Sequence, residues 1–160
     1  MNMLYSGFDT IIFAAKGAVD PKTLKLLEHV KSVASKSDRD NVIEFNDNKL
    51  KGLIAPTGTS GGYAFLLKID GSLGHVISLK ANLNQNEWNA HVKIRALSLA
   101  LNGWEIALDN ALSDLISIGF SANELSLSRI DYAMDFSNAG IVLDPADIVA
   151  HSRVKKSAHK

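Results

Sequence analysis

The stretch Leu125–Phe136, LSLSRIDYAMDF, decides the fold because polar and apolar residues alternate along it. In a β-strand, residues two apart lie on the same face of the sheet. Ile130, Tyr132, Met134 and Phe136 therefore share one face. The opposite face carries the charged residues, with one alanine among them: Arg129, Asp131, Ala133 and Asp135. The pattern predicts a long strand with one face covered by helices and the other face charged.

An amphipathic helix precedes this strand. It follows Asn102-Gly103, and Gly119 is placed to end it as a C-terminal cap. Its apolar residues recur at helical spacing, at Trp104, Leu108, Ala111, Leu115 and Ile118. We expect this stripe to pack on the apolar face of the strand, so that Trp104, Tyr132 and Phe136 are buried together.

The remaining elements give the order of the fold. Asp20-Pro21 is a helix start, since an aspartate cap is followed by proline at the first helical position. This helix runs to about residue 35, and Asp144-Pro145 begins a short last helix. Further strands are predicted at Asp9–Lys16, Val42–Phe45, Tyr63–Asp70, His75–Lys80 and Trp88–Leu97. Strands and helices in this order predict an α+β fold, with an antiparallel sheet and helices on one face.

Length and composition limit the class of protein. A chain of 160 residues has room for one core, so we expect one domain over residues 1–150 and a basic tail over residues 151–160. There is no cysteine, which excludes disulfides and thiolate metal sites. The N-terminus lacks a signal-peptide pattern and no apolar run approaches the roughly 20 residues of a membrane span, so we expect a cytoplasmic protein.

The charged faces of three predicted strands supply the candidate site. If the apolar faces lie on one side of the sheet, the other side displays Lys68, His91, Lys93, Arg95, Arg129, Asp131 and Asp135. Cations around a pair of carboxylates can hold a phosphodiester and a divalent ion. The simpler interpretation is a solvated sheet face, and the equal numbers of basic and acidic residues, 17 of each, do not favour a nucleic-acid binder.

The segment SRIDYAMDF resembles a strand of the trans-type rolling-circle replication initiators of plasmids and phages, which reads Arg-hydrophobic-Asp-x-x-x-Asp. GGYAFLLKI and WNAHVKIRALSLALNGWE resemble the preceding strands and turn of that family. The resemblance covers Gly61–Asn138 and is to the N-terminal portion of an initiator. It implies a ferredoxin-like, replication-initiator-like sheet that works in DNA replication.

The resemblance also implies roles for the candidate residues. Asp131 and Asp135 become ligands of a divalent metal, Mg or Mn. Origin DNA would lie on five side chains: Lys68, His91, Lys93, Arg95 and Arg129. Four residues along a regular strand span about 13 Å, too far for both carboxylates to hold one ion without a bulge, so we expect one of them to have a supporting role.

The chain departs from the family at the nucleophile. The tyrosine that attacks DNA follows the motif by several tens of residues in that family, whereas this chain ends 25 residues after Asp135. None of Tyr5, Tyr63 and Tyr132 fits that place, so we expect no catalytic residue and a DNA-binding domain incomplete for nicking. The alternative is a non-catalytic protein-binding or regulatory module on a ferredoxin-like sheet, with a protein partner or a homodimer as its role. A third hypothesis, a small hydrolase of another kind, is supported by no sequence motif.

Overall fold

The computed structural model describes residues 2–45, 50–71 and 73–137, and within them the chain forms an α+β fold. Seven antiparallel strands make one sheet in the order β2-β3-β4-β5-β6-β1-β7. The strands are β1 (Met3–Val19), β2 (Asn41–Phe45), β3 (Leu50–Ile54), β4 (Phe65–Ile69), β5 (His75–Leu79), β6 (Trp88–Ile94) and β7 (Phe120–Phe136). The helices are α1 (Pro21–Ser37), α2 (Ala96–Ser117) and the short 3-10 turn η1 (Ser60–Gly62).

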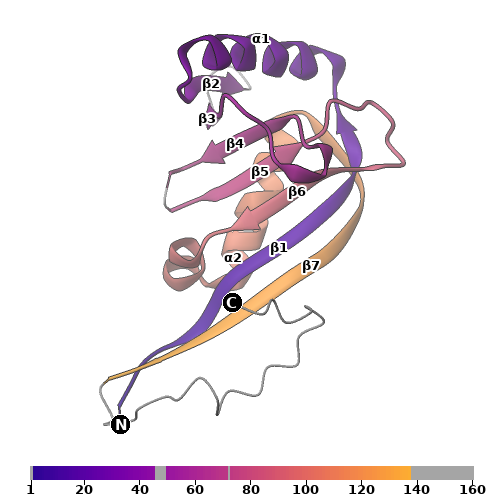
Figure 1. The fold of residues 1–160 in the computed structure, drawn as a ribbon. Coiled ribbons are helices and arrows are strands. Elements are labelled where there is room, and N and C mark those ends of the chain that lie inside the picture. The colour runs from indigo at the N-terminus through magenta and orange to yellow at the C-terminus, as the bar shows by residue number, and fades with distance from the viewer. Residues whose placement is uncertain (1, 46–49, 72, 138–160) are drawn as a thin grey trace, which may run out of the picture.

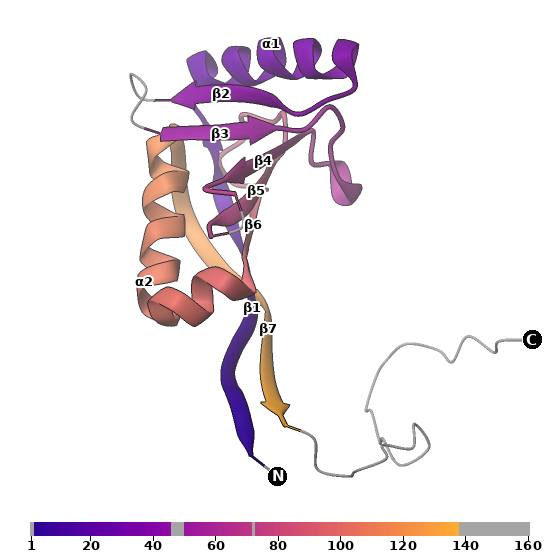
Figure 2. The same ribbon diagram turned by 90° about the vertical axis from the view of Figure 1, so that its left-hand side faces the viewer.

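The two α-helices pack on different parts of the sheet. α1 lies against β2 and β3, while α2 lies across β1, β5, β6 and β7. In Figure 1 the sheet is in front and α2 runs behind it, and Figure 2 shows α2 along one side with α1 across the β2 end. The face of β4, β5 and β6 turned away from α2 is therefore the face seen in Figure 1.

The core lies between the sheet and the helices. Alternate residues of the central strands pair in register, as in Leu67–Ile77–Val92–Phe13, and all four are buried. α2 adds Ala111 and Leu115, and α1 adds Leu27, each with 0% of its surface exposed. Complete burial of such side chains stabilises the fold by about 1.5–3 kcal/mol for each large one.

Two helix ends follow from the sequence as expected. The Asp20 carboxylate accepts hydrogen bonds from the backbone N–H groups of Lys22 and Thr23 and so caps α1. Gly119 follows α2 with φ 87°, a left-handed conformation in which a side chain is strained. A Cβ there would also lie 2.2 Å from the Asp20 carboxylate, so the residue that ends α2 lies directly against the residue that caps α1.

Several predicted boundaries change. β1 extends well beyond Asp9–Lys16, β7 begins at Phe120, and β4 begins at Phe65 rather than Tyr63. β3 was not predicted at all. α2 begins at Ala96, before the predicted start, and is kinked at Gly103, whose φ is 75°. The predicted last helix at Asp144 and the basic tail over residues 151–160 lie outside the described residues.

The predicted burial of the last strand is wrong. Ala111 and Leu115 are buried, but Trp104 is 47% exposed and Tyr132 is 58% exposed. Ile130, Met134 and Phe136 are exposed as well. The reason is that α2 covers β7 only in part, while residues 132–136 pair with Met3–Phe8 in a two-stranded ribbon. β6 pairs with β1 only from Ile11 onward, so this ribbon projects beyond the body, as Figures 1 and 2 show.

Candidate nucleic-acid interface

Strand register brings three of the predicted cations into one row on the face turned away from α2. Lys93 of β6 lies opposite Ile12 of β1, and Ile12 lies opposite Arg129 of β7. On its other side Lys93 lies opposite Val76, which lies opposite Lys68 of β4. Each cation is therefore two strands from the next, about 10 Å at the usual strand spacing. Flexible cationic side chains at this spacing can contact separate phosphates of one bound strand.

Two cations of this row are already paired. Lys68 Nζ lies 2.5 Å from the Asp40 carboxylate. The Arg129 guanidinium contacts the Asp131 carboxylate through two nitrogens, at 2.7 and 2.8 Å. This hydrogen bond and the charge of Asp131 raise the pKa of Arg129. Lys93 is exposed and forms no ion pair with any described residue, so it is the cation most available to an anion.

Arg95, one of the predicted DNA contacts, also makes a contact within the fold. It is the residue before α2, and its guanidinium donates to the backbone carbonyl of Gly71 in the turn between β4 and β5. Beside it lies a hollow of about 400 Å³ lined by Lys93, Arg95, Thr10 and Asp9. The hollow has cations on one side and a carboxylate on the other, which suits a polar ligand better than an apolar one.

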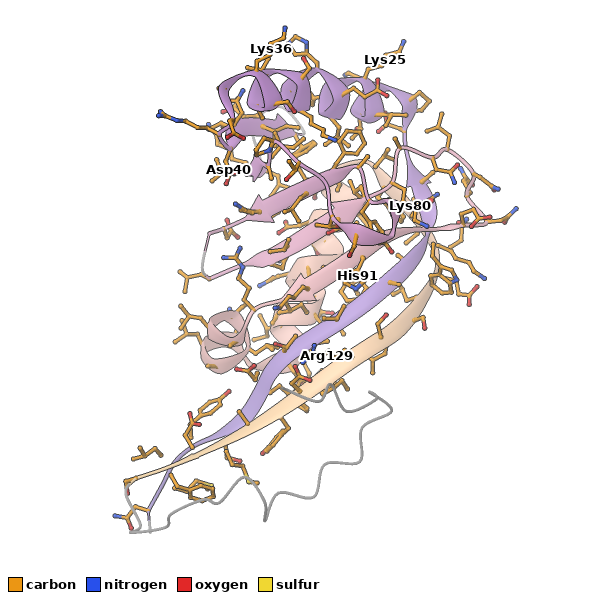
Figure 3. The ribbon with its side chains drawn as sticks, in the orientation of Figure 1. Lys25, Lys36, Asp40, Lys80, His91 and Arg129 are labelled. Atoms are coloured by element: carbon orange, nitrogen blue, oxygen red, sulfur yellow. The ribbon has the colours of Figure 1, made fainter. Side chains whose placement is uncertain are left out.

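His91 belongs to an aromatic and cationic cluster that sequence reasoning missed. The His91 ring lies 5.7 Å from the ring of Tyr63, and Lys80 Nζ lies 5.4 Å from the centroid of that tyrosine. Figure 3 shows His91 and Lys80 on the side of the sheet that faces the viewer. Burial lowers the pKa of His91, which keeps the imidazole neutral near pH 7. Aromatic rings beside a lysine are a platform on which an unpaired base can stack.

Tyr63 lies on the other face from the one predicted. The predicted strand began at Tyr63, and in a regular strand from there the Tyr63 side chain shares the face of Phe65 and Leu67. In the structure β4 begins at Phe65, after η1, and the backbone turn directs the ring onto His91. Burial raises the pKa of the Tyr63 phenol, which holds it protonated. Strand alternation could not have found this contact, since Tyr63 lies outside the strand.

The two candidate metal ligands lie on one strand but apart. Asp131 is opposite Thr10, and Asp135 is opposite Tyr5 in the projecting ribbon. The extra residues of this segment, Leu4 and Asp9, lie on β1, so β7 is regular here and about 13 Å separates the two positions. No group of three potential His, Asp or Glu ligands gathers anywhere in the described parts of the chain. The pair therefore does not fit a single shared ion.

The Tyr132 side chain points to the other face of the sheet from the Asp131 side chain, as the alternation predicts. Its ring packs edge-on against Phe8 with centroids 5.5 Å apart, and its hydroxyl is 2.7 Å from Ser6 Oγ. Tyr5 donates its hydroxyl proton to the carbonyl of Phe8, 3.1 Å away. Both tyrosines therefore belong to the ribbon and make hydrogen bonds within it.

A buried histidine beside a partly exposed aspartate lies on the α2 side of the sheet and was not predicted. His75 begins β5 and is 3% exposed, and its Nε2 lies 3.3 Å from the Asp114 carboxylate of α2. Burial lowers the pKa of His75 to about 4 and raises that of Asp114 to about 6. The alternation His75, Ile77, Leu79 could have indicated that this histidine points inward.

Comparison with known proteins adds nothing to these observations: no family model, no curated protein and no solved structure matches this chain. No helix in the described residues combines the length and the apolarity needed to cross a bilayer.

Proposed function

We propose that this chain is a DNA-binding domain of a plasmid or phage replication initiator of the rolling-circle type, and that it binds DNA on the sheet face turned away from α2. The observation that carries the proposal is the row Lys68–Lys93–Arg129, with Lys93 available to a phosphate. The motif Arg129-Ile-Asp131, which carries the initiator resemblance, lies at the end of that row. A replication-initiator-like sheet and a cytoplasmic location belong to the same proposal.

The face is suited to single-stranded or distorted DNA. Tyr63 and His91 offer ring surfaces for an unstacked base, and Lys80 and Lys93 supply charge on either side of them. Because Asp40 and Asp131 neutralise two of the three cations of the row, affinity is low and phosphates compete with carboxylates for Lys68 and Arg129. Binding of this kind weakens steeply as salt rises.

Replacement of Lys93 tests the proposal. We expect Lys93→Ala to weaken binding of a fluorescent single-stranded oligonucleotide and to lower the slope of log affinity against log salt by about one. The measurement is fluorescence anisotropy over a salt series. The matched control is Lys25→Ala, since Lys25 is an exposed lysine of α1, on the outside of the molecule (Figure 3).

The control decides between a site and general charge. Equal losses in Lys93→Ala and Lys25→Ala mean that DNA responds only to the charge of the whole chain. No salt-sensitive binding by the unaltered protein contradicts the proposal and favours the protein-binding module. That alternative has its own support in the exposed apolar residues of β7.

A further inference from the structure

The ribbon formed by residues 3–8 and 132–136 has no core of its own. Its apolar side chains are open to solvent: Met3 is 61% exposed, Met134 59% and Phe136 44%. A two-stranded ribbon without a covering layer is only marginally stable in water. The described residues include 18 large exposed apolar side chains, and 13 of them lie on β1, α2 or β7. Such a concentration marks an interaction surface rather than scattered exposure.

An apolar groove lies beside the ribbon on the same side of the sheet. It runs between α2 and β7, has a volume of about 260 Å³, and is lined by Trp104, Leu108 and Leu112 from the helix and by Leu127 and Ile130 from the strand. Ile130 lies opposite the buried Ile11, which places its side chain on the α2 face together with Tyr132 and Met134. β7 is also the last strand of the sheet in the described part of the chain, so its outer edge is unpaired there.

We propose that the groove and the ribbon are the two halves of one interface, and that its occupant is a second copy of this chain. In the proposed dimer the outer edge of β7 pairs antiparallel with β7 of the second copy, about a two-fold axis at Tyr132. Each ribbon then lies at the mouth of the other copy's groove. The contact is closed and self-complementary, as a two-fold interface requires.

The side chains of β7 select this register. With the axis at Tyr132, Ile130 lies opposite Met134 of the second copy, and both are on the α2 face. On the other face Arg129, which is paired with Asp131 of its own copy, lies opposite Asp135 of the second copy, so a second carboxylate meets each arginine. Within one copy, Asp135 has no ion pair with any described residue. Opposite charges and apolar pairs placed directly across a strand pair are each stabilising.

Three neighbouring registers are less favourable, two because like charges meet and one because a bulge enters the paired segment. With the axis at Asp131, the Asp131 carboxylates of the two copies lie opposite each other. With the axis at Ala133, Asp131 of each copy lies opposite Asp135 of the other. Like charges directly opposite are destabilising. An axis at Ile130 brings the bulge at Ser128 into the paired segment, because β7 carries an extra residue between Leu127 and Arg129. The axis at Tyr132 uses the regular segment 129–135 alone.

A single introduced cysteine tests the register directly, since the chain has none. Residues directly opposite in an antiparallel pair have Cα atoms about 4.5–5.5 Å apart, within the range that a disulfide spans. We expect Tyr132→Cys to give a covalent dimer on mild oxidation, seen on a non-reducing gel. Leu125→Cys is the matched control, an exposed apolar residue of the same strand that lies far from the axis and should not cross-link.

A charge swap tests the same interface without oxidation. Asp135→Arg places two arginines opposite each other, and we expect dimerisation measured by light scattering to weaken about tenfold. Combining it with Arg129→Asp restores the pairing with reversed charges and should recover most of the affinity. Glu28→Arg on α1 makes the same charge change away from β7 and should have no effect.

Three results overturn the proposal: a monomer at all concentrations tested, equal cross-linking of the two cysteine variants, or equal weakening by Asp135→Arg and Glu28→Arg. Lys93 lies on β6, away from the β7 edge, so these results leave the Lys93→Ala test of the proposed DNA binding unaffected.

Discussion

His75, which is buried, and the partly exposed Asp114 beside it have pKa values that are shifted in opposite directions. Burial lowers the pKa of His75 from its ordinary value of 6.5 to about 4, the positive charge of Arg95 adds to this, and Asp70 opposes it. Burial and Asp70 raise the pKa of Asp114 from 3.8 to about 6. A lowered histidine pKa gives stability that is lost as the pH falls from 6.5 to 4, while a raised aspartate pKa gives stability that is lost as the pH rises from 4 to 6.

We therefore expect the free energy of unfolding of the unaltered protein to change little over this pH range on account of the pair. Asp114→Asn leaves the histidine effect alone, so its stability should fall as the pH drops toward 4. His75→Gln leaves the aspartate effect alone, so its stability should rise as the pH drops from 6. Urea unfolding at several pH values measures both slopes, and slopes of the same sign in the two variants contradict this account.

Asp131 and Asp135 are separable as metal ligands because they lie about 13 Å apart on a regular strand. An ion that binds only the folded chain raises the melting temperature by mass action. We expect the shift produced by manganese to disappear in either Asp131→Asn or Asp135→Asn but not in both. Thermal scans of the three proteins with and without the ion measure this. Loss of the shift in both variants would mean that the two carboxylates act on one ion, against the distance between them.

At the scale of elements, the side chain that begins β7 is buried and the side chain that ends it is exposed. Phe120 is 2% exposed and belongs to the core, whereas Phe136, at the other end of the same strand, is 44% exposed. We expect Phe120→Ala to lower the free energy of unfolding by about 3–5 kcal/mol and Phe136→Ala by less than about 1 kcal/mol. Denaturant unfolding in dilute solution, where copies do not associate, compares the two. Similar losses would show that the ribbon is packed within a single copy.

The same strand shows how far sequence reasoning reached. Alternation correctly predicted that Tyr132 and Asp131 point to opposite faces, because the period of a strand is a local property of the backbone. It could not predict whether anything covers the apolar face, because that depends on where α2 ends and how far β1 runs. The same limit explains why Trp104 and Phe136 were expected in the core.

β3 was missed for a different reason. Its sequence, LKGLI, is short and contains a glycine, which argues against a strand. In the structure Gly52 lies close to Ile69 of β4, where a Cβ would come within 2.7 Å of the isoleucine Cδ1. The glycine is used for close packing between strands, and that use is visible only once the neighbouring strand is in place. For the cation row, the sequence predicted the individual residues on separate strands. Only the strand register of the structure shows that three of them form a row.

At the scale of the whole molecule, the two faces of the sheet divide the chemistry. The α2 face holds the core, the apolar groove and the apolar side of the ribbon. The other face holds the cations and the carboxylates that partly neutralise them. A net charge of zero is compatible with this division, since charge that is local to one face is what a phosphate meets.

This division leads to a prediction about DNA cleavage. Covalent nicking needs a hydroxyl nucleophile about 3–3.5 Å from the phosphorus and in line with the leaving oxygen. Tyr132 points to the face opposite Asp131, and Tyr5 is hydrogen-bonded within the ribbon. Tyr63 lies on the cationic face, but burial raises the pKa of its phenol and so disfavours the phenolate. We expect weak, salt-sensitive DNA binding without cleavage.

Incubation of the chain with supercoiled plasmid and manganese, followed by a search for nicked circles and for protein joined to DNA, is the direct assay. Tyr63→Phe and Tyr132→Phe are the informative variants because each removes only a hydroxyl. An adduct that disappears in Tyr63→Phe would make the cationic face an active site and Tyr63 its nucleophile. An adduct that disappears in Tyr132→Phe would contradict the placement of that side chain on the α2 face. We expect neither nick nor adduct in the unaltered protein, because no activated hydroxyl among the described residues lies beside Lys93 on the proposed DNA-binding face.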